Sequence, residues 1–303
     1  MARNWKYALV PGILLMVVRP VPALADSDDP SYSFLSGVQA QLITPGQSPP
    51  GANDWSCRPT AEHPNPVVLL HGVSNDTITW QTLAPALSAD GYCVFSTTFG
   101  TGLLGSTIGA MGPVEDSAGQ IGAFIHRVLG ATGAERVDLV GHSMGGAVPF
   151  YYLEHLGGAP TIDHYLALAA PLHGSTISGL TELLPMVATG PGAAAIGQCG
   201  PCQLTPDSPA LRQLNPDPAV APAISFTTIV TRYDEIATPY TTGLLDGPNV
   251  HNIVVQDLCP TDATDHNELP ADPIVVREIR NTLDPTHAQA PTCTVVLPFL
   301  GPP

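Results

Sequence analysis

The chain has 303 residues, of which 44% are apolar and 12% are charged, so its composition supports one large hydrophobic core or two small ones and argues against disorder. Its 26 acidic and 10 basic residues give a formal charge of −16, which would repel a polyanion, so nucleic-acid binding is excluded. The 29 glycines and 33 prolines follow no three-residue period, which indicates a loop-rich globular protein rather than collagen.

The start of the chain has the composition of an export signal. Arg3 and Lys6 precede an apolar stretch at residues 8–18, and small residues around Ala25 offer a cleavage site. The apolar stretch is interrupted by a Pro-Gly pair and is shorter than the roughly 20 residues that span a bilayer, which argues against a membrane anchor. We therefore expect residues 1–25 to be a signal peptide, and the mature protein to be secreted without a stable membrane span.

The next residues, 26–55, are polar and rich in turn-forming residues, which predicts an extended segment that wraps the surface. After it, short apolar runs alternate with helix-like stretches. Strands are predicted at residues 67–70, 93–97, 136–140, 165–170, 224–230 and 252–255. Helices are predicted at about residues 80–89, 114–129, 145–156 and 272–283. This alternation predicts an α/β fold with a mostly parallel central sheet covered by helices on both faces.

One catalytic domain, residues 56–283, accounts for this pattern, and a short tail, residues 284–303, follows it. A Gly/Pro/Ala-rich stretch at about residues 172–223 interrupts the pattern and predicts an inserted lid or cap. The insertion contains one apolar segment with Leu180, Leu183, Leu184, Met186 and Val187. This segment is either a lid that opens on lipid or a buried helix of the cap.

Six cysteines in an exported chain indicate disulfides, and six thiols allow 15 pairings. Proximity along the chain suggests the pairs Cys57 with Cys93, Cys199 with Cys202, and Cys259 with Cys293. The middle pair has the spacing of a thioredoxin-type redox motif, but its Gly/Pro/Ala-rich surroundings favour a structural clip. No second Cys pair or His pair stands at zinc-finger spacing, so the cysteines are not expected to bind a metal.

A serine motif follows the strand predicted at residues 136–140. The motif reads Gly141-His142-Ser143-Met144-Gly145-Gly146. A bare GxSxG pattern would occur by chance on the order of 0.1 times in such a chain, but a strand before it and a helix after it are typical of a nucleophile elbow. Glycines without bulk allow the tight turn, the turn lifts the Ser143 hydroxyl out of the sheet, and the Met144 N–H points toward an oxyanion. Ser143 is therefore the candidate nucleophile.

A second oxyanion element is predicted where the strand at residues 67–70 ends in His71-Gly72-Val73. A strand that ends in His-Gly can turn the next backbone N–H inward, so we assign the second oxyanion-hole donor to Val73. His71 is expected to hold this loop rather than to abstract protons.

A serine hydroxyl becomes nucleophilic when a histidine, oriented by a carboxylate, takes its proton. In this fold the acid and then the base follow the serine along the chain. Asp234 follows the strand at residues 224–230 and is the predicted acid, with Glu235 as its competitor. His266 lies on the loop after the last strand and is the predicted base.

Two other downstream histidines, His251 and His287, are interpreted as solvated loop residues. The predicted scheme requires no metal and no organic cofactor.

At this point the chain resembles the secreted bacterial lipases of the α/β-hydrolase superfamily, in particular the class 2 lipases common in actinobacteria. The similar stretches are residues 50–57, the His-Gly strand followed by Trp80, residues 91–95, the serine motif, Tyr233-Asp234 and Asp265-His266. This resemblance implies an extracellular carboxylic-ester hydrolase that acts on acylglycerols at Ser143, Asp234 and His266. Its partner would be a lipid or ester substrate, met at a lipid–water interface if the apolar insertion is a lid.

Three alternatives stay open at the level of sequence. An extracellular polyester depolymerase or an acyltransferase would use the same triad, and substrate profiling separates them from a lipase. A binding or cell-wall interaction protein would not need all three of Ser143, Asp234 and His266. A disulfide oxidoreductase would act through Cys199 and Cys202. The sequence leaves acyl-chain length and oligomeric state open.

Overall fold

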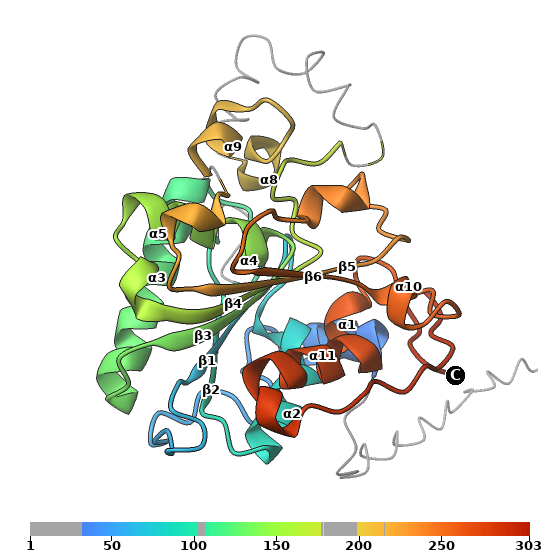
Figure 1. The fold of residues 1–303 in the computed structure, drawn as a ribbon, viewed down its shortest axis with the longest axis horizontal. Helices are drawn as coiled ribbons and strands as arrows, with labels where there is room; N and C mark the ends of the chain where they lie inside the picture. The colour runs from blue at the N-terminus through green and yellow to red at the C-terminus, as the bar shows by residue number, and fades with distance from the viewer. Residues whose placement is uncertain (1–31, 102–106, 177, 179–198, 215) are drawn as a thin grey trace, which may run out of the picture.

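The computed structural model describes residues 32–101, 107–176, 178, 199–214 and 216–303. These residues build a six-stranded sheet in the order β2-β1-β3-β4-β5-β6, in which every neighbouring pair is parallel (Figure 1). The strands are β1 (Val67–Leu70), β2 (Val94–Thr97), β3 (Val137–His142), β4 (Ile162–Leu168), β5 (Ser225–Val230) and β6 (Val250–Val254). The predicted α/β fold with a parallel sheet is confirmed.

Helices connect and cover the strands. The α-helices are α1 (Phe34–Ile43), α2 (Leu83–Ala89), α3 (Val114–Thr132), α4 (Met144–Ala147), α5 (Pro149–His155), α8 (Gly200–Gln203), α9 (Pro209–Leu214), α10 (Val255–Leu258) and α11 (Pro273–Leu283). The 3-10 helices are η1 (Thr77–Trp80), η2 (Ala159–Thr161), η4 (Pro218–Val220), η5 (Tyr240–Gly243), η6 (Leu269–Ala271) and η7 (Pro285–His287).

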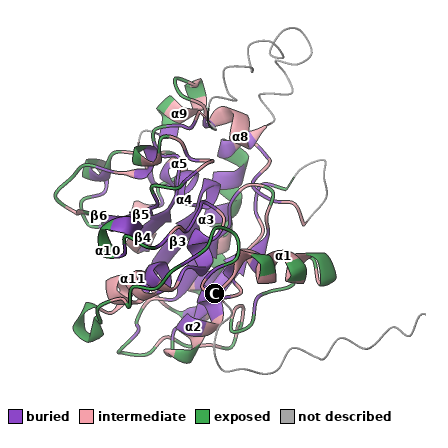
Figure 2. Ribbon diagram, turned by 90° about the vertical axis from the view of Figure 1, so that its right-hand side faces the viewer, coloured by how far each residue is buried: buried purple, intermediate pink, exposed green. Residues whose placement is uncertain are grey.

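The core is divided into two layers by the sheet. In β1, Val68 and Leu70 belong to the layer that contains the apolar side chains of α3 and α5, while Val67 and Leu69 belong to the layer of α2 and α11. Successive side chains of a strand point to opposite faces, so a strand that is apolar at every position buries both faces. Figure 2 shows β3 and β4 as mostly buried strands in the centre of the molecule. This double burial fixes the position of the strand ends that carry the candidate site.

Two helices begin where the local sequence predicts. The Asp272 carboxylate accepts hydrogen bonds from the N–H groups of Ile274 and Val275, and Pro273 stands at the first position of α11. Helix α3 has two acidic residues in its first turn and ends at Gly133, whose φ of 76° gives a left-handed cap. The boundaries predicted from sequence differ from the observed ones by a few residues in most elements.

Helix α1 is a departure from the predictions, because the sequence indicates an extended, turn-rich segment there. Its first residue, Phe34, donates its backbone N–H to Glu268 Oε2 at 2.8 Å. The helix therefore begins at an acceptor that lies 234 positions away in the chain. A contact between residues so far apart cannot be recognised from the local amino-acid sequence. A second difference is that the single helix predicted after Ser143 is divided into α4 and α5, and Pro149 starts the second of them.

The structure contains the three disulfides suggested by proximity along the chain. They join Cys57 to Cys93, Cys199 to Cys202, and Cys259 to Cys293. Helix α8 begins inside the short middle loop and ends one residue after Cys202. The predicted signal peptide and the apolar segment at residues 180–187 lie outside the described residues. No helix in the described part of the chain combines the length and the apolar composition needed to cross a bilayer.

Candidate active site

Ser143 lies on a sharp turn between β3 and α4. Its φ of 51° and ψ of −120° place a residue with a side chain in a conformation that such residues rarely adopt. Two backbone hydrogen bonds hold the turn: Ser143 N–H donates to the Leu168 carbonyl at 2.8 Å, and Gly146 N–H donates to the Ser143 carbonyl at 2.9 Å. Strain held in this way at a strand end is typical of a nucleophile elbow.

The glycines of the motif are required by close approach of the backbone. A Cβ atom on Gly141 would lie 2.0 Å from the Gly145 carbonyl oxygen. A Cβ atom on Gly145 would lie 2.2 Å from the Leu70 carbonyl oxygen, at the end of β1. Because the neighbouring atoms belong to the backbone and cannot shift without disturbing the strands, neither position can accept a side chain. The turn is therefore packed directly against the neighbouring strand.

The loop that follows β1 lies against the serine. A Cβ atom on Gly72 would lie 3.1 Å from Ser143 Cβ. His71 is completely buried, its Nδ1–H donates to the Gly72 carbonyl at 2.7 Å, and its Nε2 accepts from Phe99 N–H at 3.3 Å. Burial lowers the pKa of His71 to about 4, so the ring is neutral. As expected from the sequence, His71 holds the loop, and this places Val73 next to the serine turn.

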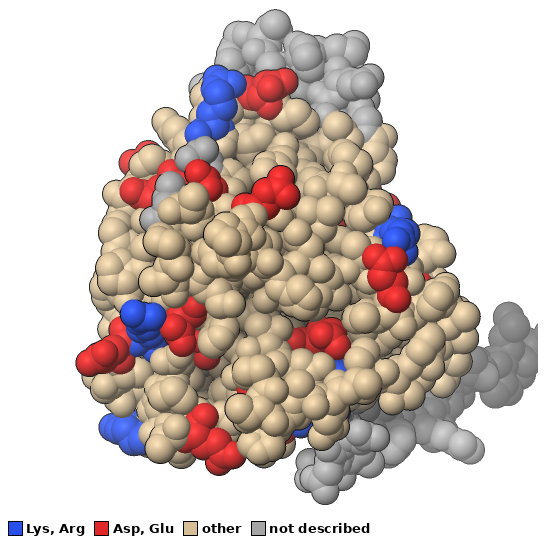
Figure 3. Space-filling model, viewed as in Figure 1, with Lys and Arg blue, Asp and Glu red and all other residues tan. Residues whose placement is uncertain are grey.

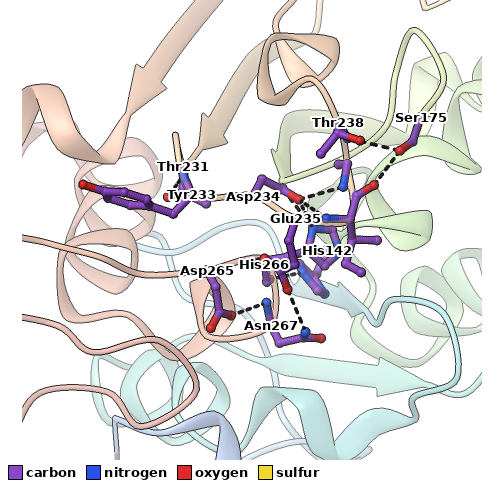
Figure 4. A network of polar contacts seen from close by, with 12 residues as sticks. His142, Ser175, Thr231, Tyr233, Asp234, Glu235, Thr238, Asp265, His266 and Asn267 are labelled. Atoms are coloured by element: carbon purple, nitrogen blue, oxygen red, sulfur yellow. Dashed lines mark hydrogen bonds and ion pairs between the residues drawn. The ribbon is translucent and has the colours of Figure 1, made fainter. Parts of the chain in front are cut away.

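Asp234 and His266 form a buried pair. His266 Nδ1–H donates to Asp234 Oδ2 at 2.9 Å, and Oδ1 lies 3.0 Å from the same nitrogen (Figure 4). Asp234 Oδ1 also accepts the backbone N–H groups of Ile236 at 2.9 Å and Ala237 at 2.6 Å. The carboxylate is thereby fixed in the loop after β5. This arrangement leaves the Nε2 side of the imidazole as the face that can exchange a proton with a substrate or nucleophile.

Glu235, the competing acid, takes a different position. Its carboxylate accepts the backbone N–H of His266 at 3.2 Å and the Asn267 side-chain amide at 3.4 Å. It contacts the backbone of the histidine loop, whereas Asp234 contacts the ring. Of the two acids, Asp234 is the one hydrogen-bonded to the imidazole.

His142 is a residue of this site that sequence reasoning did not identify. Its Nε2–H donates to the His266 carbonyl at 2.9 Å, and the centroids of the two rings lie 4.8 Å apart. Burial, with a smaller contribution from the nearby His266, holds the pKa of His142 well below its ordinary value, so its ring is neutral. Because His142 directly precedes Ser143, this hydrogen bond connects the histidine loop to the serine turn. Its only sequence signal is its place inside the serine motif.

Two further polar side chains join the loops that carry the acid and the base. Thr231 Oγ1–H donates to the Thr264 carbonyl at 2.7 Å, and Gln256 Nε2–H donates to Thr231 Oγ1 at 2.9 Å. These groups are buried, so the hydrogen bonds are not exchanged for water. They fix the spacing between the two loops.

A small apolar cavity opens beside the serine. Its volume is about 50 Å³. It is lined by Val73, Ser143, Met144, Pro171, Ser175, Pro201, Leu204, Ile236 and Ala237. The two predicted oxyanion donors and the predicted nucleophile therefore share one cavity. Two of the other lining residues, Pro201 and Leu204, come from the region of the Cys199–Cys202 clip.

The other downstream histidines are not part of this arrangement. His251 is exposed, as expected, but the prediction that it lies in a loop is wrong, because it is part of β6. His287 is exposed in the tail and pairs with Asp284 at 2.7 Å.

A second polar cluster, where β3 and β4 begin, could offer ligands to a metal. Potential ligand atoms of Asp138, Asp163 and His164 lie within 4.8 Å of one another. These groups already pair with one another and with Arg136. His164 Nδ1 lies 2.9 Å from Asp138 Oδ1, and Arg136 forms an ion pair with Asp163 at 2.9 Å. The hydrogen bond to Asp138 raises the pKa of His164. The cluster is an ion-pair network at the opposite ends of the strands from Ser143.

Comparisons with known proteins agree with this architecture. A family model described as lipase (class 2) matches residues 64–277, a range that includes Ser143, Asp234 and His266. The fold is similar to that of lipase B from Aspergillus fumigatus, with a TM-score of 0.56 and 17% identity over 83% of this chain and 63% of that chain. It is also similar to the mature lipase BlEst2 from Bacillus licheniformis, with a TM-score of 0.52 and 15% identity over 78% of this chain and 96% of that chain. This chain thus matches less than two thirds of the length of the Aspergillus lipase.

Proposed function

Since the chain belongs to the class 2 lipase family, we propose that it is a secreted serine hydrolase that cleaves the carboxylic esters of lipids such as acylglycerols. The observation that carries the proposal is the buried Asp234–His266 pair, whose loop is hydrogen-bonded to His142, the residue before the strained Ser143. A carboxylate that orients an imidazole near such a serine has the form of a catalytic triad. The three disulfides, which persist in oxidising compartments, support the secreted location.

In the proposed mechanism, Ser143 Oγ attacks the ester carbonyl carbon while His266 Nε2 takes the hydroxyl proton. Asp234 stabilises the imidazolium that forms. The tetrahedral intermediate collapses, the bond to the alcohol oxygen breaks, and His266 returns the proton to that oxygen. Water then attacks the acyl-serine by the same proton transfers, which releases the acid and restores Ser143.

The backbone N–H groups of Val73 and Met144 are the proposed oxyanion-hole donors. Both residues line the cavity beside Ser143, and Met144 is the first residue of α4. Fixed donors at the site of developing negative charge contribute about 3 to 4 kcal/mol each to the lowering of a barrier of this kind.

The direct test compares the unaltered protein with Ser143→Ala on p-nitrophenyl esters from acetyl to palmitoyl. We expect a loss of at least about a thousandfold in kcat without a change in the circular dichroism spectrum or in Tm, because the hydroxyl carries the chemistry whereas backbone hydrogen bonds hold the turn. Retention of a tenth of the activity would refute the assignment. Preference for long acyl chains favours a lipase, and preference for short ones favours an esterase.

A further inference from the structure

Helix α1 and the C-terminal tail expose an unusual amount of apolar surface. Of the ten large apolar side chains that are exposed in the described part of the chain, seven lie on these two segments. Among them are Leu35, Leu42 and Ile43 of α1 and Leu297, Phe299 and Leu300 of the tail, which we call the terminal patch. Leu42 and Ile43 are 80% and 68% exposed. Exposed apolar side chains that gather in this way mark interaction surfaces.

The two segments of the terminal patch are in contact, although they come from opposite ends of the chain. The rings of Phe34 and Phe299 lie 6.4 Å apart between centroids. Gly301 is pressed against the backbone of Tyr32, because a Cβ atom on it would lie 1.9 Å from the Tyr32 carbonyl oxygen. The tail is held in its turn by Leu297 N–H, which donates to the Gly301 carbonyl at 2.9 Å. The patch is therefore one folded feature.

The terminal patch is attached to the loops of the candidate active site. Phe34 N–H donates to Glu268, two residues after His266 in the chain. Helix α1 also packs against η1, which follows the loop of His71 and Val73, and a Cβ atom on Gly37 would lie 3.6 Å from the Ile78 carbonyl oxygen. Figure 2 shows α1 projecting from the body of the molecule, with exposed residues along it. The helix thus sits beside the strand ends that carry Ser143.

The charge of the patch indicates what kind of surface it fits. Residues 30–53 and 288–303 contain no Lys, Arg, Asp or Glu, in a chain with a formal charge of −16. On the face drawn in Figure 3, charged side chains are thinly scattered among uncharged ones. Without basic residues, the patch has no attraction for anionic headgroups, and the net charge of the chain opposes their approach. An uncharged apolar phase is the complementary surface.

We propose that the terminal patch docks the protein on the surface of an uncharged lipid phase, next to the edge of the sheet that carries Ser143. The proposal rests on the proposed hydrolysis of lipid esters, because that substrate is presented at such a surface. It assigns the contact with lipid to α1 and the tail. Docking depends on the burial of apolar side chains in the interface, as it does for interfacial helices.

The test measures binding to sedimented phosphatidylcholine vesicles with the double variant Leu42→Asp/Ile43→Asp. Both side chains are well exposed, so the fold is kept. We expect the partition coefficient to fall at least about tenfold, since two apolar contacts are lost and two charges would have to leave water. The matched control is Leu156→Asp, a 45% exposed leucine just after α5, near the start of β4 at the other end of the sheet. Its binding is expected to equal that of the unaltered protein.

Several outcomes would overturn the proposal. They are failure of the unaltered protein to bind the vesicles, equal binding by the double variant, and stronger binding to phosphatidylglycerol than to phosphatidylcholine. A dimer in sedimentation velocity that the double variant abolishes would show that a second copy covers the patch. Hydrolysis of p-nitrophenyl acetate in solution, which we expect to be unchanged in the double variant, is measured separately. If the unaltered protein binds vesicles but hydrolyses no ester, the proposed function fails and the docking surface stands.

Discussion

The Asp234 carboxylate accepts hydrogen bonds from the His266 ring and from two backbone N–H groups. Asp234→Asn removes the charge that stabilises an imidazolium and brings in an amide that can favour the wrong tautomer of the ring. A change of this kind in a serine–histidine–aspartate triad lowers kcat by about 10⁴-fold. For Asp234→Asn we expect kcat on a soluble p-nitrophenyl ester to fall between about a hundredfold and about 10⁴-fold.

Glu235→Gln is the matched control, because a glutamine can still accept the backbone N–H of His266. We expect less than about a tenfold loss of kcat for it, since it leaves the ring and its partner in place. A larger loss in Glu235→Gln than in Asp234→Asn would reverse the assignment of the acid.

Glu268 is fully buried, and its Oε2 holds the N-terminus of α1. Burial, with smaller contributions from Asp265 and Asp262, raises its pKa from 4.5 to about 7. Between these two pH values the folded protein keeps a proton that the unfolded chain releases. The stability of the folded state therefore declines as the pH rises from about 4.5 to about 7, and the cost persists above that range.

The variant Glu268→Gln keeps an acceptor for the Phe34 N–H and carries no charge. We expect it to be more stable than the unaltered protein at pH values well above 7, by on the order of 1 to 2 kcal/mol, and to lose this advantage toward pH 4.5. Urea denaturation across this pH range measures the difference. An advantage that is greatest in acid would contradict the account.

The positions of candidate residues that stand in a local motif or directly after a strand could be predicted from the sequence. Ser143 stands inside its glycine motif, and Asp234 follows a strand. The role of His142 could not be predicted, because it depends on a hydrogen bond to a carbonyl 124 positions away. The choice between Asp234 and Glu235 could be ranked but not decided, since adjacent residues differ only in where the loop directs them.

At the scale of elements, the three disulfides close loops of different length. The Cys57–Cys93 pair spans 36 positions, and the Cys199–Cys202 pair spans 3. In the chain-entropy model, removal of the first by Cys57→Ser/Cys93→Ser costs about 4 kcal/mol and removal of the second costs less than about 2 kcal/mol. Denaturation by guanidinium chloride measures both free energies of unfolding. Equal costs would show that native contacts, rather than loop length, determine the effect.

The short Cys199–Cys202 clip also borders the cavity beside Ser143. A Cβ atom on Gly200 would lie 3.2 Å from Met144 Cε, and Pro201 lines the cavity with Ser143. We therefore expect Cys199→Ser/Cys202→Ser to raise KM for p-nitrophenyl butyrate several-fold more than Cys57→Ser/Cys93→Ser does. An unchanged KM would show that α8 keeps its place without the disulfide.

Strands and helices with a clear apolar period could be predicted, and α1 could not. Strand β1 is apolar at every position and β3 is buried at every position, because both faces of these strands are covered, and this leaves a strong pattern. Helix α1 has no buried residue, so it leaves no apolar face in the sequence. Its position is set by Glu268 and the tail, which are distant in the chain.

At the scale of the whole molecule, the parallel sheet brings the ends of β1, β3 and β5 to one edge, and the loops after them carry Val73, Ser143 and Asp234. The alternation of strands and helices predicted this edge, because all strands of a parallel sheet end on the same side. The strand order and the packing of α1 and the tail beside that edge could not be predicted, since they depend on contacts between distant segments.

In the proposed mechanism His266 activates Ser143, and labelling with a fluorophosphonate probe measures this activation. The unaltered protein is predicted to gain one adduct, which peptide mapping places on Ser143, and His266→Ala is predicted to react at least about a hundredfold more slowly because no base takes the hydroxyl proton. An adduct on another residue, no adduct, or an equal rate in His266→Ala would contradict the account.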